Sequence, residues 1–476
     1  MPVTTHRKHS LQMQTSPVTS SVSSDPPDTR LEDTISTTKY ASTSPDLDLH
    51  HSITSSPSST QFPSNTQNQE QSHILQNTTV HKITPTEATK ILNERAVDIS
   101  SSIPNVESSG ICKVQIVTLP ANEQNEDTYA YDFLPDAVTK YGDSDGVDVG
   151  VQQKHWGFFA VYDGHYGPST STYLKSTLIS AVYTSLLSLY KSHLPGYPPN
   201  PLVISTISTT FKTLDSTLTS TATPSSTQGS CALLTFHDTR HNRLFTACTG
   251  DSRSVLGKRL GSPSNTRWLS KPLSTDQNFT SNPSEVTRVE SEHPGEKDVI
   301  LQGRLIGDLA VSRAFGNRRF KVPDELGGKV TRNKRQYGVL RSPPYITAEP
   351  VVTVYEGLKD GDFVLLATDG LWDFLSSEDS VALVGRWTDE HIAPAGRNSN
   401  SNNSSNDNKR KTRLTSSQEE MYVFEDDENV GVHLIRNALG GVREGKLLFT
   451  LGLEPGINKA KKHRDDITVV AVFFGS

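Results

Sequence analysis

The hydrophobic residues of the chain fall into short runs, and several of these runs are followed closely by an acidic residue. The clearest run is Phe158–Tyr162, which is followed at once by Asp163 and Gly164. Short runs rich in aromatic and β-branched residues predict buried β-strands. The run at 363–367 is followed closely by Asp369, so the order of apolar run, acid and glycine occurs twice. Both acids are therefore expected at strand ends.

The same pattern predicts further strands and helices between about residue 112 and residue 474. Continuous or alternating apolar runs predict strands. Longer segments with mixed polarity, one opened by a capping-box pattern at Ser376 and another closed by two glycines, predict helices. The expected strands are 113–119, 128–134, 158–162, 231–237, 244–248, 363–367 and 467–474, and the expected helices are 169–190, 202–218, one from 376 onward and 428–439.

Two segments lack this pattern. Residues 1–105 are rich in Ser and Thr and are expected to form a disordered tail, because such a segment cannot bury enough surface to offset chain entropy. A short helix is expected at 85–93, just outside a folded domain of residues 106–476. An Asn/Ser-rich insertion at about 394–420 is expected to be a disordered loop. Its basic cluster at 409–413 fits a solvated charge run or a nuclear signal.

Composition narrows the range of functions. The net charge of the 476 residues is −7, which gives no support to nucleic-acid binding. The three cysteines form no C-x-x-C pair, so neither a disulfide framework nor a zinc site is indicated. No run of 18 apolar residues occurs, and we predict no transmembrane helix. The start of the tail is poor in acids, which fits a mitochondrial transit peptide or a plain phosphorylatable tail.

Four acids stand beside predicted strand ends and are candidate metal ligands. Oxygen ligands without Cys or paired His suit Mg²⁺ or Mn²⁺. Two such ions about 4 Å apart can share a carboxylate and activate a water for attack on phosphorus. Taken singly, each acid could equally lie in a turn, and Glu126 with Asp127 could form an exposed acidic loop. The four candidates are Glu126, Asp163, Asp369 and Asp465.

The ordered set of motifs resembles the metal-dependent type 2C protein serine/threonine phosphatases. Each motif alone is weak, but the complete set spans almost the whole folded region in the family's order. The matching segments are Asn125–Asp127, Val161–His165, Gly229–Ala232, Thr249–Arg253, Ala310–Gly316, Ala367–Asp373 and Asp465–Thr468. The resemblance implies an α+β fold, a four-layer α-β-β-α sandwich with two central antiparallel sheets.

The resemblance also implies a ligand set for two Mg²⁺ or Mn²⁺ ions. Asp163 would bridge both ions. Glu126 and the carbonyl of Gly164 would hold one ion, and Asp369 and Asp465 would hold the other. A weaker third ion would be held by Asp251 and Asp373.

Three further residues are given roles by the same resemblance. Asp127 would orient the attacking water. His165 would protonate the leaving serine or threonine oxygen. Asn122 stands where many members of the family carry a phosphate-binding arginine, and it is the candidate substrate contact. Asn317 is a departure from the family, which usually has an aspartate there, and we expect it to affect only the structure of a loop.

Within the family, the chain is most similar to the pyruvate dehydrogenase phosphatase branch, especially its fungal mitochondrial members. This similarity implies a phosphorylated protein substrate, the pyruvate dehydrogenase complex, and a place in the mitochondrial matrix. The alternatives are a cytosolic or nuclear phosphatase of the same family and a catalytically silent scaffold. The segments that carry the similarity are Leu119–Asn122, Ser274–Gln277, Glu292–Glu296, Pro344–Pro350 and His433–Leu439.

Overall fold

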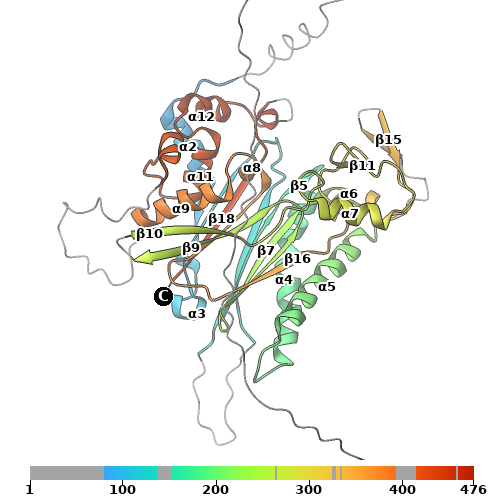
Figure 1. Ribbon diagram of the computed structural model, residues 1–476, viewed down its shortest axis with the longest axis horizontal. Coiled ribbons are helices and arrows are strands. Elements are labelled where there is room, and N and C mark those ends of the chain that lie inside the picture. Colours follow the sequence, from blue (N-terminus) through green and yellow to red (C-terminus); the bar gives the residue numbers. More distant parts are fainter. Residues whose placement is uncertain are drawn as a thin grey trace, which may run out of the picture. The chain divides into compact units, whose positions relative to one another are not determined.

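The computed structural model describes residues 80–137, 152–262, 265–323, 329–332, 335–392, 414–456 and 459–475. Two antiparallel sheets form the centre of this part of the chain (Figure 1). The six-stranded sheet has the order β1 (Ala96–Asp98), β2 (Ile111–Leu119), β18 (Ile467–Phe474), β17 (Phe363–Ala367), β9 (Arg253–Ser262) and β10 (Asn265–Pro272). The five-stranded sheet has the order β16 (Val351–Glu356), β8 (Arg243–Thr249), β7 (Ala232–Asp238), β4 (His155–Tyr162) and β3 (Thr128–Pro135).

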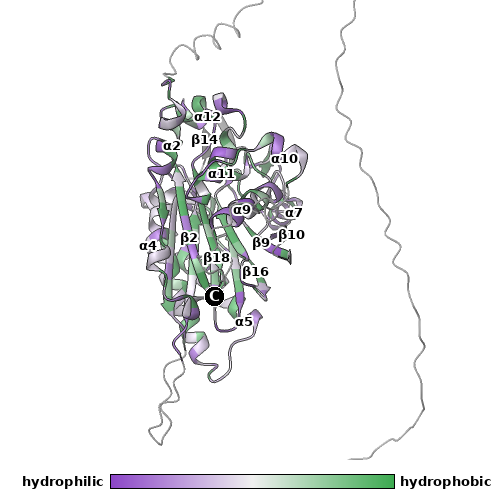
Figure 2. Cartoon of the chain, turned by 90° about the vertical axis from the view of Figure 1, so that its left-hand side faces the viewer, coloured by the Kyte–Doolittle hydropathy of each residue, from purple (hydrophilic) through white to green (hydrophobic). Residues whose placement is uncertain are grey.

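Alternation of side chains along the strands explains why the sheets stack. In β2, Val114 and Ile116 pack with Phe159 of β4 in one core cluster, while Val117 and Leu119 belong to a second cluster. Successive residues of a strand point to opposite faces. One face of β2 therefore packs against the other sheet, and its other face packs against the covering helices. The strand β18 is accordingly apolar along its length, as Figure 2 shows.

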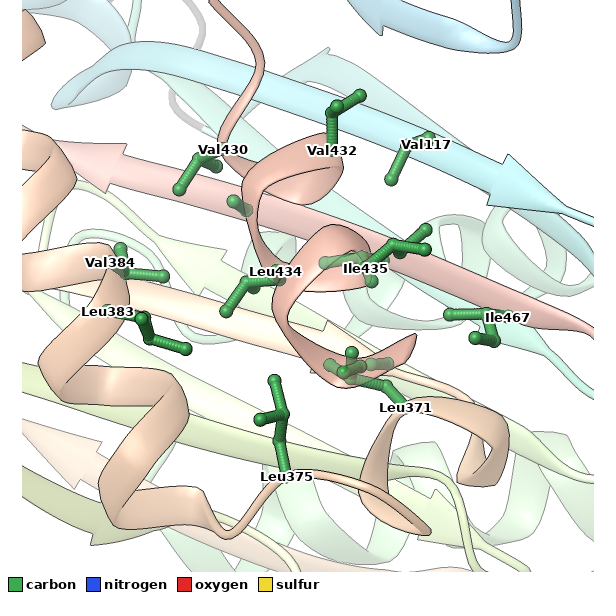
Figure 3. Close-up of a cluster of buried hydrophobic side chains, with 14 of the residues drawn as sticks. Val117, Leu371, Leu375, Leu383, Val384, Val430, Val432, Leu434, Ile435 and Ile467 are labelled. Carbon is green, nitrogen blue, oxygen red and sulfur yellow. The ribbon is translucent and has the colours of Figure 1, made fainter. Parts of the chain in front are cut away.

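Helices cover the outer faces of both sheets. The five-stranded sheet is covered by α4 (Ser169–Lys191) and α5 (Asn200–Thr219). The six-stranded sheet is covered by α2 (Pro85–Asn93), α8 (Asp369–Trp372), α9 (Ser377–His391), α11 (Val430–Leu439) and α12 (Glu444–Leu451). Figure 3 shows Leu434 and Ile435 of α11 among side chains from β2, β18 and α9. The result is the four-layer α-β-β-α sandwich that the motifs implied.

A smaller region inserted between β10 and β16 has its own buried cluster. Its helix α7 (Pro283–Glu292) is anchored by Glu285, which forms ion pairs with Arg288 and Arg313 at 2.8 and 2.7 Å. Its strands are β11 (Ile300–Leu301), β12 (Arg304–Leu305), β14 (Lys329–Arg332) and β15 (Arg335–Val339). A three-stranded sheet of β5 (Gly164–His165), β6 (Gly229–Ser230) and β13 (Phe315–Gly316) connects this region to the sandwich. The sequence pattern had given no role to most of it.

The expected domain boundary at residue 106 differs from the structure. The helix at 85–93 is present, but it packs on the sandwich, because Ala88 and Leu92 are buried in the same cluster as α11 and α12. Val80 also forms a β-bridge with Leu453. The folded unit therefore includes residues from 80 onward.

The other short elements of the described residues are three helices and three 3₁₀ turns. They are α3 (Val106–Ser109), α6 (Pro224–Thr227), α10 (Ser416–Met421) and the turns at Ser100–Ser102, Arg318–Phe320 and Ala460–Lys462.

Some expectations fall on residues that are not described. The tail before residue 80, with its transit-peptide pattern, and the insertion from 393 to 413, with its basic cluster, lie outside the described residues. The end of the expected loop is ordered, since α10 begins at Ser416 with Thr415 as its N-cap. No helix within the described ranges is long and apolar enough to span a membrane.

Candidate active site

The candidate acids meet because the strands that carry them end on the same side of the two sheets. Leu119 pairs with Ile467, Thr128 pairs with Tyr162, and Ala232 pairs with Thr249. Residues 250–252 then cross from β8 in one sheet to β9 in the other. This register brings together residues far apart in the sequence, in the part of Figure 1 where β5 and α8 are labelled.

Asp163 is at the centre of the candidate site. Single oxygen or sulfur atoms of Asp163, Asp251 and Cys231 all lie within 4.8 Å of one another. Burial, and then the charge of Asp369, raises the pKa of Asp163 well above its usual value. Burial, followed by Asp251 and Asp465, does the same to Asp369. These carboxylates are therefore close enough to repel one another strongly.

The other candidate acids belong to the same electrostatic group. Burial raises the pKa of Asp251 to about 6, and burial and Asp466 raise that of Asp127 well above its usual value. Burial also raises the pKa of Glu126. Partial loss of hydration, and then the charge of Asp465, raises the pKa of Asp373. Several carboxylates crowded into one partly buried region need compensating positive charge. An oxygen-rich donor set of this kind fits Mg²⁺ or Mn²⁺.

The repulsion predicts how the metal-free protein responds to pH. An acid whose pKa is raised by folding binds more protons in the folded state, so its contribution to stability falls as pH rises above the unfolded pKa. For Asp251 that window runs from 3.8 to about 6. In chelator, we expect the melting temperature to fall as the pH rises from about 4 to about 6 and to stay low above that, and Mn²⁺ to restore it at the higher pH. Equal melting temperatures with chelator and with Mn²⁺ at about pH 8 would contradict a cation site.

Asp466 holds the loop that carries Glu126. One of its oxygens accepts hydrogen bonds from the backbone N–H groups of Ala121 and Asn122, the latter at 2.9 Å. The other oxygen accepts from the backbone N–H of Glu126 at 2.9 Å and from the Asn122 amide at 2.9 Å. That amide also donates to Glu126 Oε2 at 3.2 Å. Asn122 thus ties two carboxylates together, and its contact with substrate stays a prediction.

Asp466→Ala tests this clamp. Loss of four hydrogen bonds to one carboxylate frees the loop at 121–126, so we expect Glu126 to lose its fixed position. The expected result is a rise of about tenfold or more in the Mn²⁺ concentration needed for half-maximal activity, together with a lower melting temperature. A matched control is Asp132→Asn, because Asp132 is exposed on β3. An unchanged metal requirement would show that the clamp does not position Glu126.

Gly164 and His165 are fixed by close packing of the backbone. A Cβ at position 164 would clash with the carbonyl oxygen of Glu126, so only glycine fits. His165 Nε2 lies 2.8 Å from the amide oxygen of Asn317, which can only accept a hydrogen bond. Nε2 therefore carries the proton of the neutral ring, and Nδ1 is unprotonated. Burial lowers the pKa of His165 to about 4. Asn317 is buried and has a φ of 50°, so it shapes its loop as expected. Its hydrogen bond shows that it also contacts His165, the candidate proton donor.

Three residues of the site were not singled out from the sequence. Lys461 forms an ion pair with Asp465, and its charge offsets part of the rise that burial causes in the pKa of Glu126. Thr368 Oγ1 donates to Asp127 at 2.7 Å. Asp466, described above, is the third. Thr368 and Asp466 had a local signal, since they lie in the matching segments Ala367–Asp373 and Asp465–Thr468, whereas Lys461 had none.

Comparison with known proteins identifies the family. The Protein phosphatase 2C family profile matches residues 132–409, which is more than half of the chain. The chain belongs to the protein phosphatase 2C family. It is therefore a protein serine/threonine phosphatase of the 2C type, and its substrates are phosphoproteins. Phosphatases of this family generally depend on Mg²⁺ or Mn²⁺, in agreement with the donor set found here.

Sequence alignments with two yeast relatives cover more than three quarters of the phosphatase. It is 33% identical to a protein phosphatase 2C homologue of Schizosaccharomyces pombe, over 78% of this chain and 86% of that one. It is 30% identical to the mitochondrial pyruvate dehydrogenase phosphatase 1 of Saccharomyces cerevisiae, over 77% of this chain and 69% of that one. The human mitochondrial pyruvate dehydrogenase phosphatase 1 is 35% identical over 49% of this chain and 45% of its own length.

Proposed function

We propose that the phosphatase hydrolyses phosphoserine and phosphothreonine at the cluster of acids around Asp163, with divalent cations held by that cluster. The observation that carries this proposal is the convergence of partly buried carboxylates from both sheets, which have raised pKa values and need cations. The charges of Asp369, Asp127, Asp465 and Asp251 all act on Asp163, which would contact two ions. Glu126 and the Gly164 carbonyl would hold one ion, Asp369 and Asp465 the other, and Asp251 with Asp373 a weaker third.

Bound ions would supply positive charge that activates a water and neutralises the phosphate. The other roles belong to the protein's own groups. Asp127 is held by Thr368 and would accept a proton from, and orient, the attacking water. His165 would give a proton to the departing serine or threonine oxygen. Asn122 would face the phosphate while it holds the loop of Glu126.

The test of this proposal is hydrolysis of an aryl phosphate by pure full-length protein. We expect activity with added Mn²⁺ or Mg²⁺ and loss of activity with chelator, because the acids alone repel both the phosphate and one another. Restoration of activity by excess metal would exclude irreversible damage by the chelator. Turnover that is independent of metal would overturn the metal-based mechanism.

We further propose that the phosphatase acts on phosphoserine of the pyruvate dehydrogenase α subunit in the mitochondrial matrix. The support is the similarity to the mitochondrial relatives and the branch motifs near Asn122 and at 292–296 and 344–350. A cytosolic or nuclear role is the alternative, since the relative from Schizosaccharomyces pombe is named only as a phosphatase 2C homologue. A catalytically silent scaffold is disfavoured because all four acids expected to bind the first two ions are present.

The substrate is tested in cells that lack the protein. We expect pyruvate dehydrogenase phosphorylation to rise and to return to normal when the wild-type chain is restored. The Asp369→Asn variant is the matched control, because it should fold but not restore dephosphorylation. Unchanged phosphorylation together with a location outside mitochondria would overturn the substrate proposal and leave the phosphatase chemistry standing.

A further inference from the structure

Tyr166 follows His165 directly and has a backbone conformation that tyrosine seldom adopts. Its φ is 63°, in the left-handed region where a Cβ is strained. A glycine would avoid this strain, and the chain places glycine at 164 and 167 but not at 166. Strained residues of this kind persist where the surrounding structure fixes them, and they concentrate at functional sites.

The surrounding structure fixes the backbone on both sides of Tyr166. Before it, strands β5 and β6 pair, and a Cβ at Gly164 would clash with the carbonyl of Glu126. After it, a Cβ at Gly167 would clash with the side chain of Gln228. Tyr166 therefore forms the turn between two closely packed segments, and its backbone is held in the left-handed conformation.

The side chain of Tyr166 forms an ordered surface with Arg319 beside His165. The Tyr166 ring meets the His165 ring edge to face, with centroids 5.3 Å apart. The Arg319 guanidinium lies 4.8 Å from the centre of the Tyr166 ring and 4.5 Å from that of Phe320. It also forms a 2.5 Å ion pair with Asp308. Tyr166 is nevertheless 45% exposed, and the Arg319 side chain is 40% exposed.

We propose that Tyr166 and Arg319 form a recognition surface for the substrate residue next to the phosphorylated serine or threonine, and that this surface favours a residue with an aromatic ring. This inference rests on the proposed function, because it assumes that the phosphate binds at the acids around Asp163. Because the Tyr166 ring lies against the ring of His165, the residue next to a phosphoserine bound there would come close to Tyr166.

The chemistry of the surface determines this preference. A tyrosine ring that already contacts His165 and Arg319 loses little side-chain entropy on binding, and it offers apolar area to another ring. The Arg319 guanidinium, 4.8 Å from the centre of this ring, can also attract the face of a second aromatic ring. That charge is already paired with Asp308, so an acidic neighbour gains less than it would from a free guanidinium. Bulk and planarity, more than charge, should therefore decide which peptides bind well.

The experiment compares phosphopeptides that differ only in having Phe or Ala on either side of phosphoserine. With Mn²⁺, we expect the wild-type enzyme to prefer the Phe peptide on one side by about 2- to 10-fold in kcat/KM, mainly through KM. Tyr166→Ala should reduce this ratio to about 1, and Tyr166→Phe should retain it.

Tyr197→Ala is the matched control. Tyr197 is 53% exposed and lies 4.7 Å from the guanidinium of Arg243, so it reproduces the aromatic-cation arrangement. Tyr197 lies far from the acids, because Arg243 pairs with Asp238 at one end of β7 and β8 and the acids lie at the other end. The peptide preference of this variant should equal that of the wild type.

Two further measurements complete the test. Binding of the same peptides as non-hydrolysable phosphonates, followed by fluorescence anisotropy, reports the preference even if turnover is absent. Binding that favours Phe without any turnover would support the recognition surface and overturn the proposed function. Turnover with an unchanged Phe-to-Ala ratio in Tyr166→Ala would overturn the recognition surface alone.

Tyr166→Gly separates recognition from packing. Glycine adopts a φ of 63° without strain, so we expect the melting temperature to stay equal or rise while the Phe preference is lost. A lower melting temperature with the preference retained would show that Tyr166 serves packing, and would overturn the proposal.

Discussion

Asp163→Asn is expected to lower kcat/KM for an aryl phosphate by about 10³-fold or more. The substitution removes the charge nearest the centre of the acid cluster, and cation stabilisation of phosphoryl transfer contributes several kcal/mol, where each 1.36 kcal/mol is about tenfold in rate. Excess Mn²⁺ should not restore the loss. Asp132→Asn, which removes an exposed acid from β3, should keep wild-type activity.

Asp163→Asn should lower activity but raise the stability of the metal-free protein. Without metal, Asp163 is repelled by Asp369 and the other acids, so an uncharged amide should raise the melting temperature in chelator. The increase that the wild type gains from added Mn²⁺ should shrink, because one shared ligand is missing. A variant with full activity at low Mn²⁺ would show that Asp163 is not a ligand, and a less stable variant in chelator would contradict the repulsion.

His165→Ala is expected to affect substrates according to their leaving group. Protonation matters most for the poor alkoxide leaving group of phosphoserine, where general acid catalysis contributes about 10²–10⁴-fold. An aryl phosphate has a good leaving group and should lose much less. Burial lowers the pKa of His165 to about 4 in the metal-free protein, and the negative charge of a bound phosphate beside it would favour the protonated ring again.

The ratio of the two losses is the measurement that decides the role of His165. Equal losses on phosphoserine peptides and aryl phosphates would assign it a structural role, consistent with its contact to Asn317. His165→Gln separates these possibilities further, because its amide keeps a hydrogen-bond donor for Asn317 without providing an acid near neutral pH. It should resemble His165→Ala if the proton donor is what matters.

Much of the sandwich was predictable because its signals are local. The apolar runs at 363–367 and 467–474 became β17 and β18 with the expected bounds, since a buried strand needs a continuous run of side chains that pack on both faces. Helix α9 began after its cap at Ser376 for a similarly local reason. Helix α7 was missed, because its polar sequence gains stability from ion pairs between Glu285 and distant Arg313.

The sequence also placed the candidate acids at strand ends, because an apolar run followed by an acid and a glycine is a short-range pattern. It could not show that both sheets present these ends on one side, which depends on strand register across hundreds of residues. Nor could it show that residues from 80 onward belong to the folded unit, since α2 is stabilised by packing on α12.

The sequence by itself determined the family, the order along the chain of the strands that carry the acids, and the chemical type of the candidate metal ligands. Only the tertiary structure decided that Asp466 clamps the loop of Glu126, that Lys461 reaches Asp465, and that Tyr166 is strained beside Arg319. The physical reason is that hydrogen bonds, ion pairs and backbone strain arise between segments distant in the chain, and no local pattern of residue types specifies them.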